Sequence, residues 1–384
     1  MSRSKSTNRL VIVVVVLLVV ALVIPMVIGL GGRGTTSTYS YNNQDVKERI
    51  AKLSKINVAT VNSRNVTKLD YDREVSNQYT ELVTKGKARL DQLDSIRAKV
   101  LDELVTEALI LDAAKKAGYT ISQAEINELV EYDKTGFASE EEWHAFLANW
   151  DFTEQLYADF VRDQEIISKY PQQVIGNITV SEDEIQAEYE DRLSRTPGLK
   201  LEDVRSNIIT MLTYSKQSET YQDWMQNLKD SATITYNMPR AQAYKAFVDG
   251  DYNSAEELYR TAMKEEPEDP YIPLNLGIVL VRNDKTDEGL DMMNKAMELE
   301  PADPYIPLVQ GEFLYSVGEV EKATEILRLA SEKATDDLSA HTDIKAAFVK
   351  MGLTEEVERE NEILKEILEK NKQQLQQQQM MNVQ

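Results

Sequence analysis

The chain has 384 residues, which suggests two or three domains, and its 43 Lys and Arg against 65 Asp and Glu give a formal net charge of −22. So acidic a protein repels nucleic acid and anionic lipid headgroups, which excludes most nucleic-acid-binding functions. It contains no cysteine, and its two histidines, His144 and His341, lie far apart in the sequence, so disulfides, thiol catalysis and Cys- or His-based metal sites are not expected.

The first predicted element is an uncharged apolar run at residues 10–32, which follows Arg3, Lys5 and Arg9. The run is long enough to cross a bilayer core of roughly 30 Å as a helix. The positive-inside rule keeps residues 1–9 in the cytoplasm and places the rest of the chain on the other side. A cleaved signal peptide is the alternative, but its apolar part usually spans about 7 to 15 residues and ends at a small-residue site. We therefore expect an uncleaved single-pass anchor.

The segment after the anchor reads as a linker and then as the start of a folded domain. Residues 33–45 are small and polar, and Lys47 to Lys55 favour a short helix. Residues 56–62 alternate apolar and polar side chains like a strand, as do residues 232–236. We expect these two strands to pair and to bring the ends of a domain at 46–236 together.

Between these strands the pattern is helical. Residues 90–117 place an apolar stripe at helical spacing, and Gly118 is the expected C-cap. A break at 194–200 precedes a helix from Leu201 to Lys229. Capping pairs mark three further helix starts, two of them with a hydrophobic staple: Ser122 and Glu125 (with Ile121 and Ile126), Ser139 and Glu142, and Ser181 and Glu184 (with Val180 and Ile185).

The C-terminal part repeats every 34 residues, the period of tetratricopeptide (TPR) repeats. Pro270-Tyr-Ile-Pro-Leu recurs as Pro304-Tyr-Ile-Pro-Leu. Small residues recur in phase at Ala262, Ala296 and Ala330, but prolines replace the usual Trp of the first helix. We expect about three repeats with capping helices over 237–370, and assign no structure to the Gln-rich tail at 371–384.

No catalytic motif is evident. The sequence has no P-loop, no G-x-G-x-x-G and no H-E-x-x-H, and its S-x-x-K, Ser2 to Lys5, lies in the predicted cytoplasmic segment. Carboxylates are abundant, so an Asp/Glu pair is not excluded. Their clustering at helix N-termini is explained by capping and the helix dipole. No metal or cofactor site is expected.

Several stretches, in their order along the chain, resemble the N-terminal chaperone domain of the SurA/PpiD/PrsA foldases. They are Val58-Ala-Thr-Val-Asn-Ser-Arg-Asn-Val-Thr-Lys, the helix from Val100 to Gly118, Thr179-Val-Ser-Glu-Asp-Glu-Ile-Gln-Ala-Glu-Tyr-Glu, and Ala232-Thr-Ile-Thr-Tyr. The resemblance covers residues 56–236 and implies a bacterial protein that binds unfolded or newly translocated polypeptides.

The chain departs from this family at one point. Such foldases usually insert a parvulin prolyl-isomerase domain after the helix that contains Tyr189, but here Leu201 follows too closely for any domain. The His pair of a parvulin site is also missing. We therefore expect the chaperone role without isomerase activity, and no other enzymatic activity.

Two sets of side chains are candidates for binding polypeptides. An aromatic-rich stretch is either a cradle for unfolded chains or core, with Trp143 and Trp150 the better candidates for exposure. It comprises Phe137, Trp143, Phe146, Trp150, Phe152, Tyr157 and Phe160.

The second set is the expected inner face of the TPR helices, at motif positions 2, 5, 9 and 12. It is aromatic and aliphatic rather than the Lys/Asn/Arg set that clamps a C-terminal carboxylate, and either takes an apolar segment or packs the stack itself. It comprises Asn237, Arg240, Tyr244, Phe247, Tyr271, Leu274, Ile278, Val281, Tyr305, Leu308, Glu312 and Tyr315.

Together these features predict a mainly α-helical protein: an N-terminal transmembrane helix, a SurA-like helical domain with a small two-stranded element, and a TPR solenoid. We expect a non-enzymatic, extracytoplasmic chaperone in the bacterial cytoplasmic membrane, without a small-molecule substrate. The resemblance suggests the Sec translocon as the partner of the TPR module. The alternative is a TPR scaffold for cell-envelope assembly.

Overall fold

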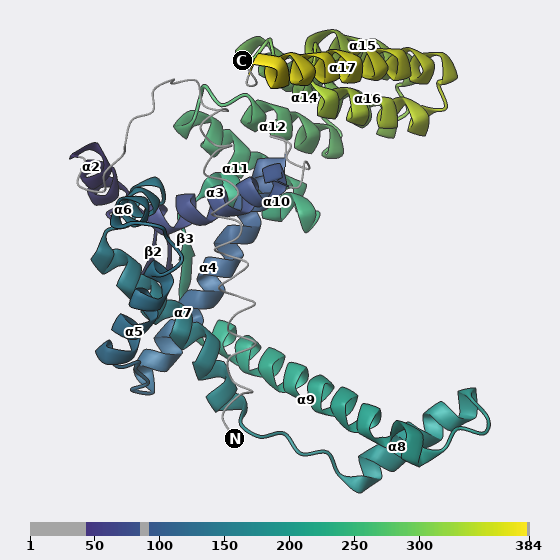
Figure 1. Ribbon diagram of the computed structural model, residues 1–384. Coiled ribbons are helices and arrows are strands. Elements are labelled where there is room, and N and C mark those ends of the chain that lie inside the picture. The colour runs from purple at the N-terminus through teal and green to yellow at the C-terminus, as the bar shows by residue number, and fades with distance from the viewer. Residues whose placement is uncertain (1–43, 85–91, 382–384) are drawn as a thin grey trace. The chain divides into compact units, whose positions relative to one another are not determined.

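The computed structural model describes residues 44–84 and 92–381 (Figure 1), so the predicted anchor at 10–32 lies outside the described residues. Within the described ranges, no helix combines the length and apolarity needed to cross a bilayer. The described chain is mainly helical with one small antiparallel sheet, as predicted. It forms two compact units. The helical unit comprises the described residues up to Arg73 together with Leu101–Asn237, and the repeat unit comprises Glu74–Val100 together with the chain from Met238 onward.

The sheet of the helical unit joins the two ends of that unit. β1 (Asn57–Val61) pairs antiparallel with β3 (Ile234–Tyr236), with Ala59 opposite Tyr236, so the predicted pairing is confirmed. A third strand, β2 (Arg64–Thr67), pairs with the other edge of β1 and was not expected. Its Arg-Asn-Val-Thr sequence offers one apolar residue, too little for a period-two pattern. Val58, Ala59 and Val61 are fully buried.

The helices around this sheet begin and end close to their predicted positions. α4 ends before Gly118, whose φ of +69° matches the expected left-handed C-cap. The capping box at Ser181 and Glu184 is complete. Ser122 caps the next helix as predicted, but the Glu125 carboxylate pairs with Lys169 instead of completing the box. The helices are α2 (Gln44–Leu53), α3 (Lys68–Thr84), α4 (Leu93–Lys116), α5 (Gln123–Lys134), α6 (Glu140–Asn149), α7 (Glu154–Ile175), α8 (Glu182–Arg195) and α9 (Leu201–Ser231).

α8 and α9 form a helical arm within the helical unit. α8 lies against the end of α9 that is remote from α5 and α7 (Figure 1). Only Ile185 in α8, and Ile208 and Met225 in α9, are buried, so the arm has a thin core. Polar contacts hold the pair, including Lys216 to Glu184 and the Tyr189 hydroxyl to the Leu199 carbonyl. The connection between the two helices spans residues 196–200.

The repeat unit contains four consecutive helix pairs at the predicted period. Small residues let the paired helices approach closely: a Cβ on Gly277 would lie 2.6 Å from the Gly289 carbonyl oxygen. The helices are α10 (Pro239–Val248), α11 (Tyr252–Glu265), α12 (Tyr271–Arg282), α13 (Thr286–Leu299), α14 (Tyr305–Ser316), α15 (Val320–Ala334), α16 (Leu338–Met351) and α17 (Thr354–Met381).

Two features of the repeat unit differ from the expected domain layout. Glu74–Val100, which the sequence grouped with residues 46–236, belongs to the repeat unit. The helix α17 extends to Met381, whereas no structure was assigned to residues 371–384. Gln, Leu and Met are good helix formers, so the low-complexity tail continues a helix that tertiary packing has already nucleated.

Candidate polypeptide-binding surfaces

The aromatic-rich stretch is mostly core. α6 directs Trp143, Phe146 and Leu147 to one buried face, because these positions are one helical turn apart. Trp143, one of the two better candidates for exposure, is 1% exposed and meets Tyr157 edge-on with ring centroids 5.0 Å apart, so it belongs to the core. Phe146, Phe152 and Tyr157 are also buried, while Phe137 and Trp150 are half-buried.

Polar contacts fix this aromatic core. The Tyr157 hydroxyl donates to Asp133 at 3.0 Å, and burial raises the pKa of both groups. The Arg73 guanidinium lies 3.7 Å from the Phe152 ring centroid and donates to the carbonyls of Trp150 and Asp151. Because the rings are packed and held from two sides, the four buried aromatics do not form a preformed cradle.

Exposed large apolar side chains of the helical unit lie on α7 and α9, and singly at Tyr132 of α5 and at Ile56 before β1. Tyr214 is 74% exposed and Met211 38%, one turn apart on the arm. Phe160 and Val174 on α7 are each 41% exposed, and α7 and α9 are in contact. Phe160 was among the expected residues, whereas the other three were missed. The sequence of an amphipathic helix shows which side chains lie on its apolar face, but not which of them are covered by another helix.

The predicted inner face of the repeats divides into two groups. Arg240, Tyr271, Leu274 and Leu308 are buried and hold the stack together, whereas exposure had been one of the two interpretations. For example, the Tyr271 hydroxyl donates to Asp303 of the next repeat. The other eight members of the set are exposed or partly exposed: Asn237, Tyr244, Phe247, Ile278, Val281, Tyr305, Glu312 and Tyr315. These eight leave part of their surface accessible along the described part of the face.

The face is also more polar at its first repeat than the sequence indicated. Arg240 is buried because its guanidinium binds Asp94 and Asp269. Asn275 and Tyr259, which were not singled out, converge on the same Asp94 carboxylate. These polar contacts are made within the repeat unit, to the side chain of Asp94. No spacing pattern links Asp94 to residues so far along the chain.

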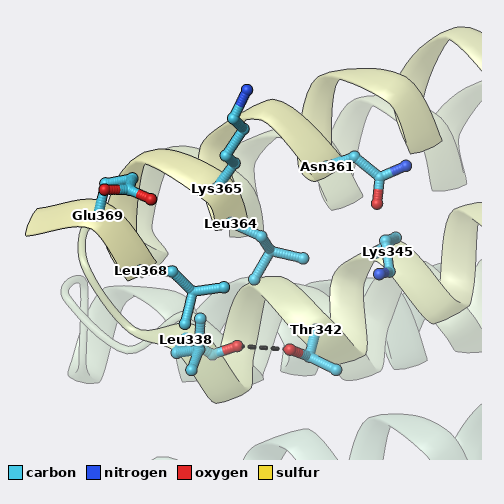
Figure 2. A pocket seen from close by; sticks show the side chains of 8 residues that line it. All are labelled: Leu338, Thr342, Lys345, Asn361, Leu364, Lys365, Leu368 and Glu369. Carbon is cyan, nitrogen blue, oxygen red and sulfur yellow. Dashed lines mark hydrogen bonds between the residues drawn. The ribbon is translucent and has the colours of Figure 1, made fainter. Parts of the chain in front are cut away.

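A shallow pocket of about 440 Å³ lies between α16 and α17 (Figure 2). Its apolar part is formed by Leu338, Leu364 and Leu368, and its polar part includes Lys345 and Asn361. The Thr342 hydroxyl donates to the Leu338 carbonyl at 2.7 Å and is thereby occupied within α16. The pocket offers room for an apolar side chain but no set of converging catalytic groups.

The described part of the chain contains no group of three or more His, Asp or Glu residues placed to hold a metal ion. His144 lies 3.7 Å from both Glu140 and Glu154, and His341 pairs with Glu360. Both histidines therefore have structural contacts within their own unit.

Comparison with known proteins agrees with this architecture. Residues 1–171 match the family model of the SurA-like N-terminal domain, and residues 246–306 match a tetratricopeptide repeat, which confirms the predicted resemblance. The foldase protein PrsA of Clostridium acetobutylicum is 23% identical over 158 residues, covering 38% of this chain and 47% of that protein. PrsA of Clostridium kluyveri is 21% identical over 162 residues, covering 37% and 48%.

The chain thus spans about half the length of the curated relatives it matches. Among solved structures, MamA MSR-1 C2 aligns with 19% identity and a TM-score of 0.25, covering 34% of this chain and 75% of that one.

Proposed function

Because the chain joins a SurA-like N-terminal domain to tetratricopeptide repeats, we propose that it is an extracytoplasmic chaperone that binds unfolded or newly translocated polypeptides. The observation that carries this proposal is the presence of exposed apolar side chains on α7 and α9. Tyr214, Met211, Phe160 and Val174 offer contacts without a fixed hydrogen-bonding pattern, which suits clients of varied sequence. The acidic surface keeps such a protein soluble while it holds apolar segments.

The proposal includes chaperone activity without prolyl isomerisation or other catalysis. The short connection between α8 and α9 supports the absence of isomerase activity, because foldases of this kind usually insert their parvulin domain at this position. α8 ends at Arg195 and α9 begins at Leu201, which leaves no room for a domain at this position. We expect no acceleration of cis–trans isomerisation in a proline-containing tetrapeptide, and measurable acceleration would contradict this part.

The proposed location is the bacterial cytoplasmic membrane, with the folded units outside the cytoplasm. This location is supported by the apolar run at 10–32, which follows three basic residues.

We propose that the repeats dock a membrane partner such as the Sec translocon, through the partly exposed groove residues. Protease treatment of spheroplasts tests the orientation: digestion of the bulk of the chain is expected, and full protection would contradict it.

Suppression of client aggregation tests the chaperone role. We expect the full chain to reduce light scattering of a chemically unfolded client. The double variant M211S/Y214S should need several-fold more protein for the same effect, because it removes apolar contact area from α9. The matched control S215A/Q217S changes exposed polar residues of the same helix and should behave as wild type.

Two outcomes would count against the proposal. Absence of suppression at molar excess would favour the alternative, a scaffold for envelope assembly. Equal activity of M211S/Y214S and the control variant would show that α9 is not the client-binding surface.

A further inference from the structure

The last helix pair carries an open groove at the place where each earlier pair is covered by the next repeat. α12 packs on α11, α14 on α13 and α16 on α15, so the first helix of each following repeat covers the pair before it. Among the described helices, none follows α17 to cover the last pair. We call this surface the terminal groove. It is lined on one side by Leu338 and Thr342 of α16, and on the other by Asn361, Leu364 and Leu368 of α17.

The terminal groove is neither a closed core nor a fully polar cap. A polar outer face is what the last repeat of a stack needs for solubility, and Thr342 and Asn361 provide it in part. At the equivalent positions, the second and third repeats have fully buried apolar residues: Leu274 and Leu308, and Met293 and Leu327. Leu368 is nevertheless 53% exposed and Leu338 37%, and both line the groove (Figure 2). Exposed leucines that share one groove indicate a contact surface.

The stripe that α17 presents to the groove is self-complementary when two copies of the helix run antiparallel. Its members are Asn361, Leu364, Leu368 and Asn371, at the spacing of three, four and three residues that is typical of a helix–helix seam. An antiparallel alignment with Leu364 opposite Leu368 of a second copy also places Asn361 opposite Asn371. A two-fold axis repeats both contacts, so leucine meets leucine and amide meets amide throughout.

The charges beside this stripe match in the same register. Lys365 then lies within one helical turn of Glu369 of the second copy, and Lys372 within one turn of Glu362. All four side chains are exposed. Because the chain has a net charge of −22, self-association requires opposite charges at the contact. A parallel pairing in register would instead place Lys365 against Lys365 and Glu369 against Glu369, so the charges select the antiparallel arrangement.

We propose that two copies of the chain associate through their terminal grooves, with the two α17 helices antiparallel and each lying in the groove of the other copy. The exposed leucines of each copy are then covered by leucines of the second copy, which removes apolar surface from water. The contact continues the stacking by which each repeat covers the one before it. It is separate from the exposed apolar residues on α7 and α9, so this proposal and the proposed chaperone function fail independently.

Sedimentation of the full chain, kept dissolved in detergent, tests the association. We expect wild type to be a dimer at micromolar concentrations and L368S to dissociate at least tenfold more readily. The matched control V320S removes a valine of α15 that is 42% exposed, and it should behave as wild type. Because Leu368 is half exposed, L368S should keep the thermal midpoint of the monomer. A wild type that remains monomeric, or equal dissociation constants for L368S and V320S, would overturn the proposal.

Reversal of charges tests the antiparallel register. K365E places a carboxylate beside Glu369 of the second copy, so we expect its dimer to dissociate at least tenfold more readily than that of wild type. The double variant K365E/E369K restores opposite charges at both symmetric contacts and should recover the affinity of wild type. A double variant that dimerises no better than K365E would overturn the register.

Disulfide cross-linking tests the same contact without weakening the leucine stripe. The chain contains no cysteine, so a single introduced cysteine forms a disulfide only between copies. In the proposed register residue 365 lies near the two-fold axis, whereas residue 366 points to the opposite side of α17. We expect K365C to form a covalent dimer under mild oxidation at least tenfold faster than E366C. Equal rates for the two variants would overturn the proposal.

Discussion

At the scale of single residues, buried polar pairs are the positions where a substitution is expected to lower the stability of the fold most. His341 and Glu360 in the fourth helix pair are both almost fully buried, with Nδ1 and Oε2 2.7 Å apart. The other ring nitrogen lies 3.1 Å from the Thr335 carbonyl oxygen. Both ring nitrogens face acceptor atoms, so one proton must lie between the ring and Glu360 and another on Nε2.

This arrangement predicts unequal effects of two substitutions. H341L leaves the Glu360 carboxylate buried without its partner and should cost about 3–5 kcal/mol of unfolding free energy. E360Q keeps a donor for Nδ1 while Nε2 still donates to Thr335, so its cost should be clearly smaller. Denaturant titration of both variants measures the difference, and equal losses would contradict the hydrogen-bonding scheme.

Glu184 predicts a pH dependence in the arm. Its hydrogen bonds from Lys216, and then from the Ser181 backbone, lower its pKa from 4.5 to about 2. Because the pKa is lower in the folded state, the contribution to stability is fully present above pH 4.5 and is lost as the pH falls through about 2. Hydrogen exchange of α8 amides should show wild type more protected than E184Q at neutral pH. The difference in protection between wild type and E184Q should shrink below pH 4.5. A difference that stays constant down to pH 2 would contradict the predicted contribution of ionised Glu184.

At the scale of elements, the paired helices of the repeats differ in how closely they approach. A Cβ at Gly289 would lie 2.7 Å from the Gly277 carbonyl oxygen, so backbone meets backbone between α12 and α13. At Gly311 the two nearest atoms belong to the Leu327 side chain, at 2.6 and 2.8 Å, and the nearest backbone atom, the Ala323 carbonyl oxygen, lies at 3.3 Å. Repeats 1 and 3 have Ala255 and Ala323 where repeat 2 has Gly289, both fully buried. The need for glycine is therefore local to one helix pair.

The variants G277A and G311A test this contrast. Overpacking against backbone should make G277A lose about 1–3 kcal/mol of stability. G311A should lose less, because it displaces a side chain and gains some helix propensity. Thermal unfolding of the two variants side by side gives the comparison, and a larger loss for G311A would show that α14 and α15 are the more constrained pair.

At the scale of the whole molecule, the unit boundaries do not follow the order of the chain. Glu74–Val100 packs with repeats that begin more than a hundred residues later. A fragment of residues 238–384 therefore lacks Asp94. We expect amides of α10 and α11 to exchange at least tenfold faster in the fragment than in the full chain, while those of α15 and α16 remain unchanged. Identical exchange throughout would mean that Glu74–Val100 adds no stability to the repeats.

Local sequence patterns determined much of this protein by themselves. Apolar periodicity predicted α4 and α9, capping residues located the start of α8, and the 34-residue period predicted the stacked helix pairs. Alternation at both ends of the helical unit predicted the pairing of β1 with β3. The helices and strands themselves depend on neighbours along one element, so nearby residues are sufficient to specify them, whereas the pairing of β1 with β3 was inferred from two alternating segments together.

Tertiary structure alone decided which apolar and charged side chains are available for binding. Trp143 is core, Tyr214 is exposed, and Arg240 is buried against Asp94, although periodicity gives no reason to separate them. Burial depends on which helix faces meet, and the spacing of residues within one helix does not specify the helix face that packs against it. The candidate binding surfaces therefore follow from packing between helices, which a reading of one sequence does not contain.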